Sequence, residues 1–281
     1  MGSNLVHALL AQGRHVRVLD DFSTGRRANL DEIAGEIELL QGDLRDPATC
    51  ARAVAGVDFV LHQGAVPSVS RSVSDPRLNH DANATATLNM LIAARDAGVK
   101  RFVHASSSSI YGDAPTLPKQ EEMAPHAPSR PARWPSWRRR VTCRVFNELY
   151  GLETVCLRYF NVFGAAPRPA VTLLGGDSAL RHGHAQGERP VIYGDGLQSR
   201  DFTFVANNIT GQSAGHHVPG VGGQVFNIAC GRRYPARSGG SAQPHPERIE
   251  PGFARVWRRQ ALAGGHHPGR DGTGLPCAGR F

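Results

Sequence analysis

Four serines in a row, Ser106 to Ser109, end a short apolar run of the kind that forms a buried strand. A serine hydroxyl at a strand end can hydrogen-bond a reacting hydroxyl, or it can satisfy nearby backbone groups. An acidic pair, Asp20-Asp21, ends an earlier apolar run. A carboxylate there can accept hydrogen bonds from both hydroxyls of an adenosine ribose, or it can begin a turn.

Two further loops follow apolar runs and contain glycine, which lets a ligand approach the backbone. They suit an adenine ring and a pyrophosphate, and they are Gly42-Asp43-Leu44 and Gln63-Gly64-Ala65. Together with the acidic pair they favour a dinucleotide site over an isolated turn. Because a carboxylate repels a 2′-phosphate, Asp20 favours NAD over NADP as the cofactor.

The elements that must position these residues are short strands alternating with helices. The predicted strands are 15–20, 37–43, 58–64, 101–107 and 154–160, and the predicted helices are Asn4–Gln12, Pro47–Ala55 and Asn83–Ala97. This alternation predicts a doubly wound α/β fold, in which helices cover both faces of a parallel sheet. Ligands of such sheets bind at the carboxyl ends of the strands.

Composition narrows the class of protein. The 281 residues carry a net charge of +8, almost all of it from arginine. Five scattered cysteines predict neither a disulfide framework nor a metal site. No apolar run reaches the roughly 20 residues that span a bilayer, so no membrane contact and a cytoplasmic location are expected. Four segments lack periodicity and are rich in Gly, Pro, Arg and His: 126–140, 165–186, 208–217 and 232–281.

Several motifs resemble those of the extended short-chain dehydrogenase/reductase family, specifically its NAD-dependent nucleotide-sugar 4-epimerases of the UDP-glucose and UDP-N-acetylglucosamine type. They are MGSNLVHALLAQGRHVRVLDDFSTG, GDLRD, HQGAVPSVSRSVSDP, ASSSSIYGD, LRYFNVFG, RPVIYGDGLQSRDFTFV and VFNIACG. In order, they cover about two thirds of the chain. The resemblance implies a Rossmann-like NAD-binding domain at 1–164 and a small substrate-binding part at 165–281. It also implies a UDP-sugar substrate and a homodimer formed through two helices.

The family moves a hydride from C4 of the sugar to NAD and back, while a tyrosine takes the proton of the 4-hydroxyl. A lysine four residues later lowers the pKa of that tyrosine. By position, Ser107 matches the family's serine or threonine on the same oxygen, and Ser108 would help to hold the sugar. The resemblance assigns four more residues: Tyr159 near the nicotinamide, Asn161 orienting the sugar nucleotide, Arg200 neutralising the diphosphate, and Asn83 buried beneath the site.

Two parts of the family pattern are missing. The glycine loop Gly-x-x-Gly-x-x-Gly is represented only by its third glycine, Gly2, and the strand before it is absent. No Tyr-x-x-x-Lys occurs, since neither Tyr111 nor Tyr150 has a lysine at that spacing. The sequence therefore predicts a sheet without its first strand and a chain without epimerase activity.

The missing Tyr-x-x-x-Lys belongs where the sequence reads ARWPSWRRR, 132–140. Tryptophan among arginines suits stacking on bases, whereas Pro135 argues against a helix. A third interpretation uses the genetic code, because codons permitted for 133–137 read Val-Ala-Lys-Leu in a shifted frame. Shifted frames also give family-like sequence at 210–215 and 257–267. The sequence is thus interpreted as a truncated, locally frame-shifted family member. The alternatives are a non-catalytic dinucleotide-binding remnant and an arginine-rich nucleic-acid binder.

Overall fold

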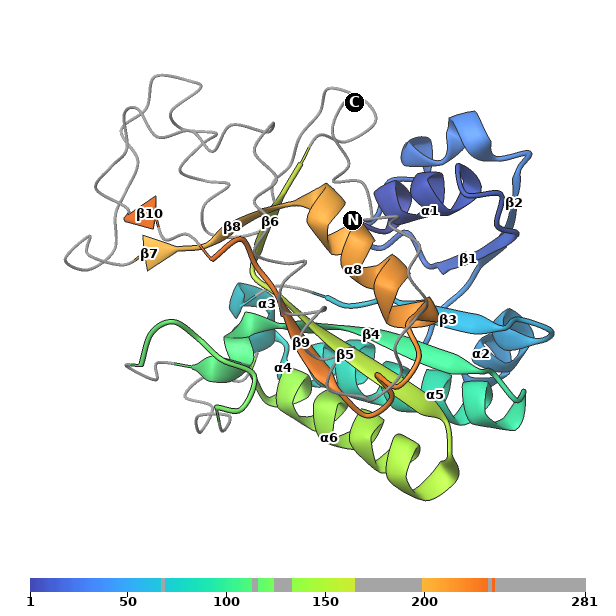
Figure 1. Cartoon of the computed structure of the whole chain (residues 1–281). Coiled ribbons are helices and arrows are strands. Elements are labelled where there is room, and N and C mark those ends of the chain that lie inside the picture. The colour runs from blue at the N-terminus through green and yellow to red at the C-terminus, as the bar shows by residue number, and fades with distance from the viewer. Residues whose placement is uncertain (67–68, 113–115, 124–132, 165–198, 232–233, 236–281) are drawn as a thin grey trace, which may run out of the picture.

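The computed structural model describes residues 1–66, 69–112, 116–123, 133–164, 199–231 and 234–235 (Figure 1). The sequence features at 165–186 and 257–267, and most of 232–281, lie outside the described residues. Helices and strands alternate along the first part of the chain, as the sequence predicts. Within the described residues, no helix combines the length and apolar character needed to cross a bilayer.

The longer strands among the described residues form two parallel sheets. The first pairs β1 (Val16–Asp20) with β2 (Ile37–Gln41). The second has the order β3-β4-β5-β9 and contains β3 (Phe59–His62), β4 (Arg101–Ser107), β5 (Glu153–Tyr159) and β9 (Val225–Ile228). Among the described strands, none pairs with both β1 and β3, so the predicted α/β fold is present with its sheet in two parts.

Shorter strands lie near the carboxyl ends of the second sheet. The strand β6 (Asn161–Phe163) pairs in parallel with β8 (Phe202–Phe204), and β7 (Ser199–Arg200) pairs antiparallel with β10 (Tyr234–Pro235). The predicted boundary between an NAD-binding domain (1–164) and a substrate-binding part (165–281) remains a prediction. The strand β9 lies after this boundary in the sequence, yet it pairs with β5 in the four-stranded sheet.

Helices cover both faces of the four-stranded sheet (Figure 1). On one face lie α5 (Ala86–Asp96) and α6 (Arg133–Tyr150), and on the other lies α8 (Val205–His217). The remaining helices are α1 (Gly2–Leu10), α2 (Pro47–Val54), α3 (Val69–Ser74) and α4 (Pro76–His80), with a π-helical turn at Asp81–Thr85. Short 3-10 turns occupy Arg27–Asn29, Asp31–Ile33 and Ser108–Tyr111.

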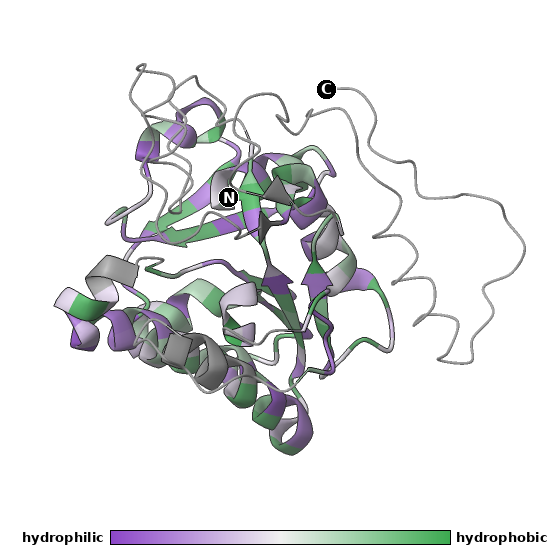
Figure 2. Ribbon diagram, turned by 90° about the vertical axis from the view of Figure 1, so that its left-hand side faces the viewer, coloured by the Kyte–Doolittle hydropathy of each residue, from purple (hydrophilic) through white to green (hydrophobic). Residues whose placement is uncertain are grey.

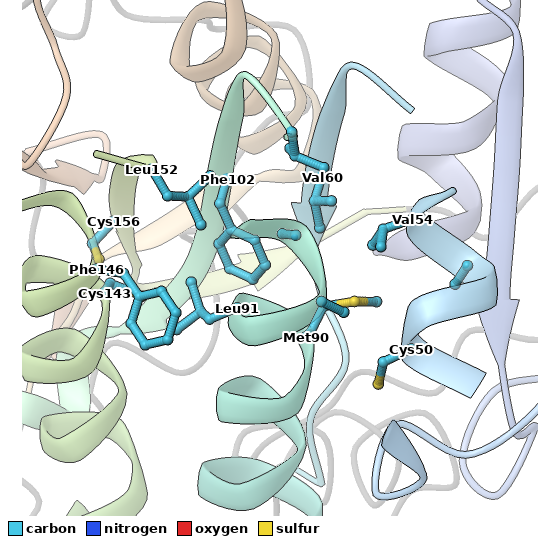
Figure 3. Packing of buried hydrophobic residues seen from close by; sticks show 14 residues of the cluster. Cys50, Val54, Val60, Met90, Leu91, Phe102, Cys143, Phe146, Leu152 and Cys156 are labelled. Carbon is cyan, nitrogen blue, oxygen red and sulfur yellow. The ribbon is translucent and has the colours of Figure 1, made fainter. Parts of the chain in front are cut away.

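The main core lies between β4, α5 and α6. Figure 3 shows Phe102 of β4 beside Leu91 of α5, with Phe146 of α6 nearby, and all three side chains are buried. The covering helices carry both apolar and polar residues, as Figure 2 shows, because each has one side against the sheet and one toward solvent. A separate apolar cluster around Val6 and Ile33 supports the small β1–β2 sheet.

The structure corrects two predictions of irregular chain. Residues 133–140 form the first part of α6, although Pro135 argued against a helix. That proline lies in the first turn, where the backbone N–H groups have no intrahelical partner and its missing N–H costs little. Residues 208–217 belong to α8. There Gly215 lets the helix approach the sheet closely, since a Cβ would lie 3.0 Å from Val103 Cγ1.

Candidate active site

Ser107 and Tyr159 end neighbouring strands, β4 and β5, and are register partners in the ladder. The backbone N–H of Ser109 donates to Ser107 Oγ at 3.1 Å, so this serine caps the 3-10 turn Ser108–Tyr111. Its hydroxyl proton can still be donated, because accepting one hydrogen bond uses only a lone pair. Ser107 can therefore support the local backbone and donate a hydrogen bond to a ligand oxygen at the same time.

The hydroxyl of Tyr159 joins two strand ends to α8. Gln212 Nε2 donates to Tyr159 Oη at 2.5 Å, and Tyr159 lies 3.5 Å from Gln63 Oε1 at the end of β3. Burial of this hydroxyl raises the pKa of Tyr159, so it stays protonated at neutral pH. Sequence reasoning missed Gln212, because it lies in a segment without apolar periodicity.

The acidic pair after β1 shapes a turn. Asp20 Oδ1 accepts from Phe22 N at 2.8 Å, and Asp21 Oδ1 accepts from Ser23 N at 2.9 Å and from Ser23 Oγ at 2.7 Å. A Cβ at Gly25 would lie 3.3 Å from Asp20 Oδ2, so glycine keeps that side of the carboxylate open. The turn thus occupies Asp21 and one oxygen of Asp20, and the other Asp20 oxygen borders the space at Gly25.

The loops after β2 and β3 meet, although their strands belong to different sheets. A Cβ added at Gly64 would overlap Leu44 Cδ1, so the absence of a side chain there lets Leu44 lie against the loop after β3. The neighbouring Asp43 carboxylate is paired with Arg45, whose guanidinium lowers the pKa of that carboxyl through its hydrogen bond. The predicted loop residue Ala65 follows Gly64 and is half-buried.

We expect Gly64→Ala to lower the free energy of unfolding by about 1–3 kcal/mol, because the added methyl overlaps Leu44. Urea unfolding would measure the change, and Leu44→Ala supplies the matched second variant. If the overlap is the cause, the double variant loses less stability than the sum of the two single variants. Additive losses would place the cause elsewhere.

Asn83 lies beneath the loop after β3, where the resemblance places it. Its Oδ1 accepts from Val66 N at 3.1 Å, and its Nδ2 donates to Asn79 O at 2.8 Å. The side chain is buried, and both ends of its amide bond the chain itself. Asn83 therefore supports the loop that contains Gly64 and Ala65, and a direct cofactor contact remains a prediction.

Asn161 begins β6, immediately beyond the end of β5. Its backbone N and its side-chain Nδ2 both donate to Asp201 O, each at 3.1 Å. Arg200, predicted to meet the diphosphate, precedes Asp201 and pairs through its backbone with Tyr234. The side chain of Arg200 lies outside the described part of the structure. Asp201 was overlooked in the sequence, although it lies within the QSRDF motif.

Gly2 is the first residue of α1, and a Cβ there would meet no atom within 4 Å. The N-terminus of a helix offers free backbone N–H groups and a positive dipole end to a phosphate. An open helix N-terminus and a carboxylate with one open side are the kinds of group that bind the pyrophosphate and the ribose hydroxyls of a dinucleotide. The residues present are thus compatible with NAD, although a single glycine forms much less of a phosphate cradle than a full glycine loop.

Neither tyrosine considered in the sequence replaces the missing tyrosine–lysine pair. Arg158 Nη1 donates to Tyr111 Oη at 2.5 Å, yet Tyr111 is 2% exposed and burial raises the pKa of its hydroxyl. Its proton goes to Asn227 Oδ1 at 2.6 Å. Tyr150, at the end of α6, is half exposed and stacks near Arg95. Tyr111 is thus bonded on both sides and Tyr150 lies exposed at the end of α6, so neither is placed as the general base.

Comparison with protein families gives a match over residues 1–229 to the NAD dependent epimerase/dehydratase family. A relative, the UDP-glucose 4-epimerase of Mycolicibacterium smegmatis, is 34% identical over 239 residues, which cover 82% of this chain and 74% of the relative.

Solved structures show the same likeness. One is the UDP-N-acetylglucosamine 4-epimerase of Methanobrevibacter ruminantium in complex with UDP-N-acetylmuramic acid, with a TM-score of 0.75 and 31% identity over 84% of this chain and 75% of that one. Another is the UDP-glucose 4-epimerase of Thermus thermophilus in complex with NAD, with a TM-score of 0.72 and 31% identity over 84% of this chain and 76% of that one.

Proposed function

Because the chain belongs to the NAD dependent epimerase/dehydratase family, we propose that it is a nucleotide-sugar 4-epimerase fold that binds NAD and a UDP-hexose. The observation that carries the proposal is the grouping of Ser107, Tyr159 and Asn161 at adjoining strand ends. Relatives named as UDP-glucose and UDP-N-acetylglucosamine epimerases support the choice of substrate class.

Each group of residues has a role in this proposal. The carboxylate of Asp20 accepts the ribose hydroxyls, and the N-terminus of α1 at Gly2 faces the pyrophosphate. Ser107 donates a hydrogen bond to the oxygen at C4 of the sugar, and Ser108 helps to hold the ring. Bound NAD would supply the acceptor and donor of the hydride. Asn161 and Arg200 orient the sugar nucleotide and neutralise its diphosphate.

A second candidate is a protein that binds the dinucleotide without turnover. The observation that favours it is the missing Tyr-x-x-x-Lys, since the remaining residues bind and position but have no strong base. Binding and catalysis are therefore tested separately.

Titration calorimetry with UDP-glucose tests the substrate class. We expect saturable binding of UDP-glucose, and much weaker binding of GDP-glucose as a matched control. A chain that binds NAD but no uridine nucleotide would support the second candidate. A chain that binds neither ligand would contradict both.

We expect NAD to bind more tightly than NADP, because Asp20 accepts ribose hydroxyls and repels a 2′-phosphate. Replacing Asp20 by alanine should weaken NAD binding about tenfold, the effect of losing one hydrogen bond to a charged group. Calorimetric titration of both dinucleotides gives the ratio. Asp31→Ala, an exposed acid on a neighbouring turn, is the control and should leave NAD affinity unchanged. Tighter binding of NADP would contradict the role of Asp20.

A further inference from the structure

Asp201 joins three segments that are far apart in the sequence. It lies between β7 and β8, and its backbone carbonyl oxygen accepts both hydrogen bonds from Asn161. Its carboxylate accepts from the backbone N–H groups of Cys230 and Gly231, at 3.0 and 2.7 Å, just beyond β9. The hydroxyl of Thr203 donates to the same carboxylate at 3.2 Å.

The contact with Asn161 determines which way its amide faces. A backbone carbonyl can only accept, so the nitrogen of the Asn161 side chain must face Asp201. The carbonyl oxygen Oδ1 of Asn161 then faces away from this contact. Asn161 is therefore oriented before any ligand arrives, with an acceptor as the polar atom that the contact leaves available.

The carboxylate fixes the turn after β9 in a similar way. Two successive N–H groups converge on its two oxygens, and charge-assisted bonds of this kind are among the stronger hydrogen bonds in proteins. Gly231 has φ +74°, a conformation that glycine adopts without strain. The turn also carries the Cys230 thiol, which accepts from Asn207 Nδ2 at 3.3 Å.

We propose that Asp201 is a positioning residue for the sugar-nucleotide site, holding Asn161 on one side and the turn at Cys230 and Gly231 on the other. This inference rests on the proposed function, because Asn161 is assigned to the sugar nucleotide there. The Asp201 carboxylate itself is occupied by the chain, so it acts through the turn at Cys230 and Gly231 rather than by touching the ligand, while the backbone carbonyl holds Asn161.

The reactivity of the Cys230 thiol measures the contact between Asp201 and the turn after β9 without any ligand. Burial raises the pKa of its thiol, and the Asp201 carboxylate raises it further. Removing that charge lowers the thiol pKa and increases the thiolate fraction, which is the form that alkylating reagents attack. Among the other cysteines, Cys50, Cys143 and Cys156 are buried, and peptide mass spectrometry separates each site from Cys230.

The main variant is Asp201→Asn, which keeps the shape of the side chain but removes its charge and one acceptor. We expect UDP-glucose affinity to fall about tenfold, as for the loss of one charge-assisted hydrogen bond. The affinity for ADP-ribose, which lacks any sugar-nucleotide contact at Asn161, should stay within about twofold. Iodoacetamide should alkylate Cys230 faster in Asp201→Asn.

Asp58→Asn is the matched control, because Asp58 forms an exposed pair with Lys100 at the opposite ends of the strands. It should change neither affinity nor the rate of alkylation. An equal loss of UDP-glucose and ADP-ribose affinity in Asp201→Asn would reduce Asp201 to a general structural role and overturn the proposal. Unchanged alkylation of Cys230, or unchanged UDP-glucose affinity, would also overturn it. If the unaltered chain binds no UDP-glucose, the proposed function fails and this proposal fails with it.

Discussion

The 281-residue chain should show no measurable 4-epimerase activity on UDP-hexoses. Removing a positioned general base typically lowers a rate by about 10²–10⁴, and the lysine that would tune the base is missing as well. The buried Tyr111 does not replace it, because its hydroxyl is held between Arg158 and Asn227 and its pKa is raised. The pKa of Tyr159 is also raised by burial, so its hydroxyl keeps its proton at neutral pH and cannot take up another.

A coupled epimerase assay on three proteins gives the comparison: the chain itself, a repaired chain, and the repaired chain with Ser107→Ala. The repair writes a helix with Tyr before Ala-Val-Ala-Lys into 132–140, adds a first strand with its glycine loop, and replaces the other shifted segments. The helical backbone already present at the start of α6 suits this replacement. We expect activity only in the repaired chain, and a large loss on removal of the Ser107 hydroxyl.

Either of two results would contradict this expectation. Activity in the unrepaired chain would mean that another group provides the base. Inactivity of a well-folded repaired chain on every UDP-hexose tested would falsify the epimerase proposal itself.

The chain should also have low thermal stability, because its parallel sheet is divided between β1 and β3. Among the described residues, β1 pairs only with β2 and β3 pairs only with β4, so each of the two has one edge without a neighbouring strand. A buried backbone group left unpaired costs about 1–3 kcal/mol. Exposed edges also favour aggregation. Phe59, the first residue of β3, is 40% exposed, and its ring contacts that of His216 edge-on.

Thermal unfolding followed by circular dichroism measures the stability of the chain. We expect a broad transition or aggregation, well below the melting temperature of the repaired chain. A cooperative transition well above about 60 °C, which is high for an intact mesophilic domain, would show that the divided sheet is stable as it is.

The strands β1 to β5 were predictable because each is a short apolar run that a parallel sheet buries. The predicted 101–107 and the observed Arg101–Ser107 agree, and so do the ends that place Asp20 and Ser107. The helices α6 and α8 were not predictable from the periodicity of apolar residues. Their sequences are rich in arginine, glycine or polar residues, and the helices form because they pack on the sheet, as Gly215 does against Val103.

The candidate site was predictable only in its strand-end residues. The end of a strand can be recognised in the sequence, because polar residues follow a short apolar run. A contact such as that of Gln212 with Tyr159 depends instead on how α8 crosses the sheet. Asp201 stood inside a recognised motif, but its contacts with Asn161 and Cys230 join segments 40 and 29 residues away. Such contacts follow from tertiary structure alone.

The separate cluster beneath β1 and β2 has a consequence for how ligand binding and partial unfolding are linked. Val6, Leu30 and Ile33 form a small apolar cluster, and the partly buried Leu19 and Leu40 of the same sheet pack against the large core. A unit with so little buried apolar surface opens at a lower free energy than the rest of the chain. Because Asp20 belongs to that unit, a dinucleotide would bind only its closed form, and part of the binding free energy would be used to close it. The cofactor would thus act as a ligand that completes folding, while the serine end of β4 remains ordered without it.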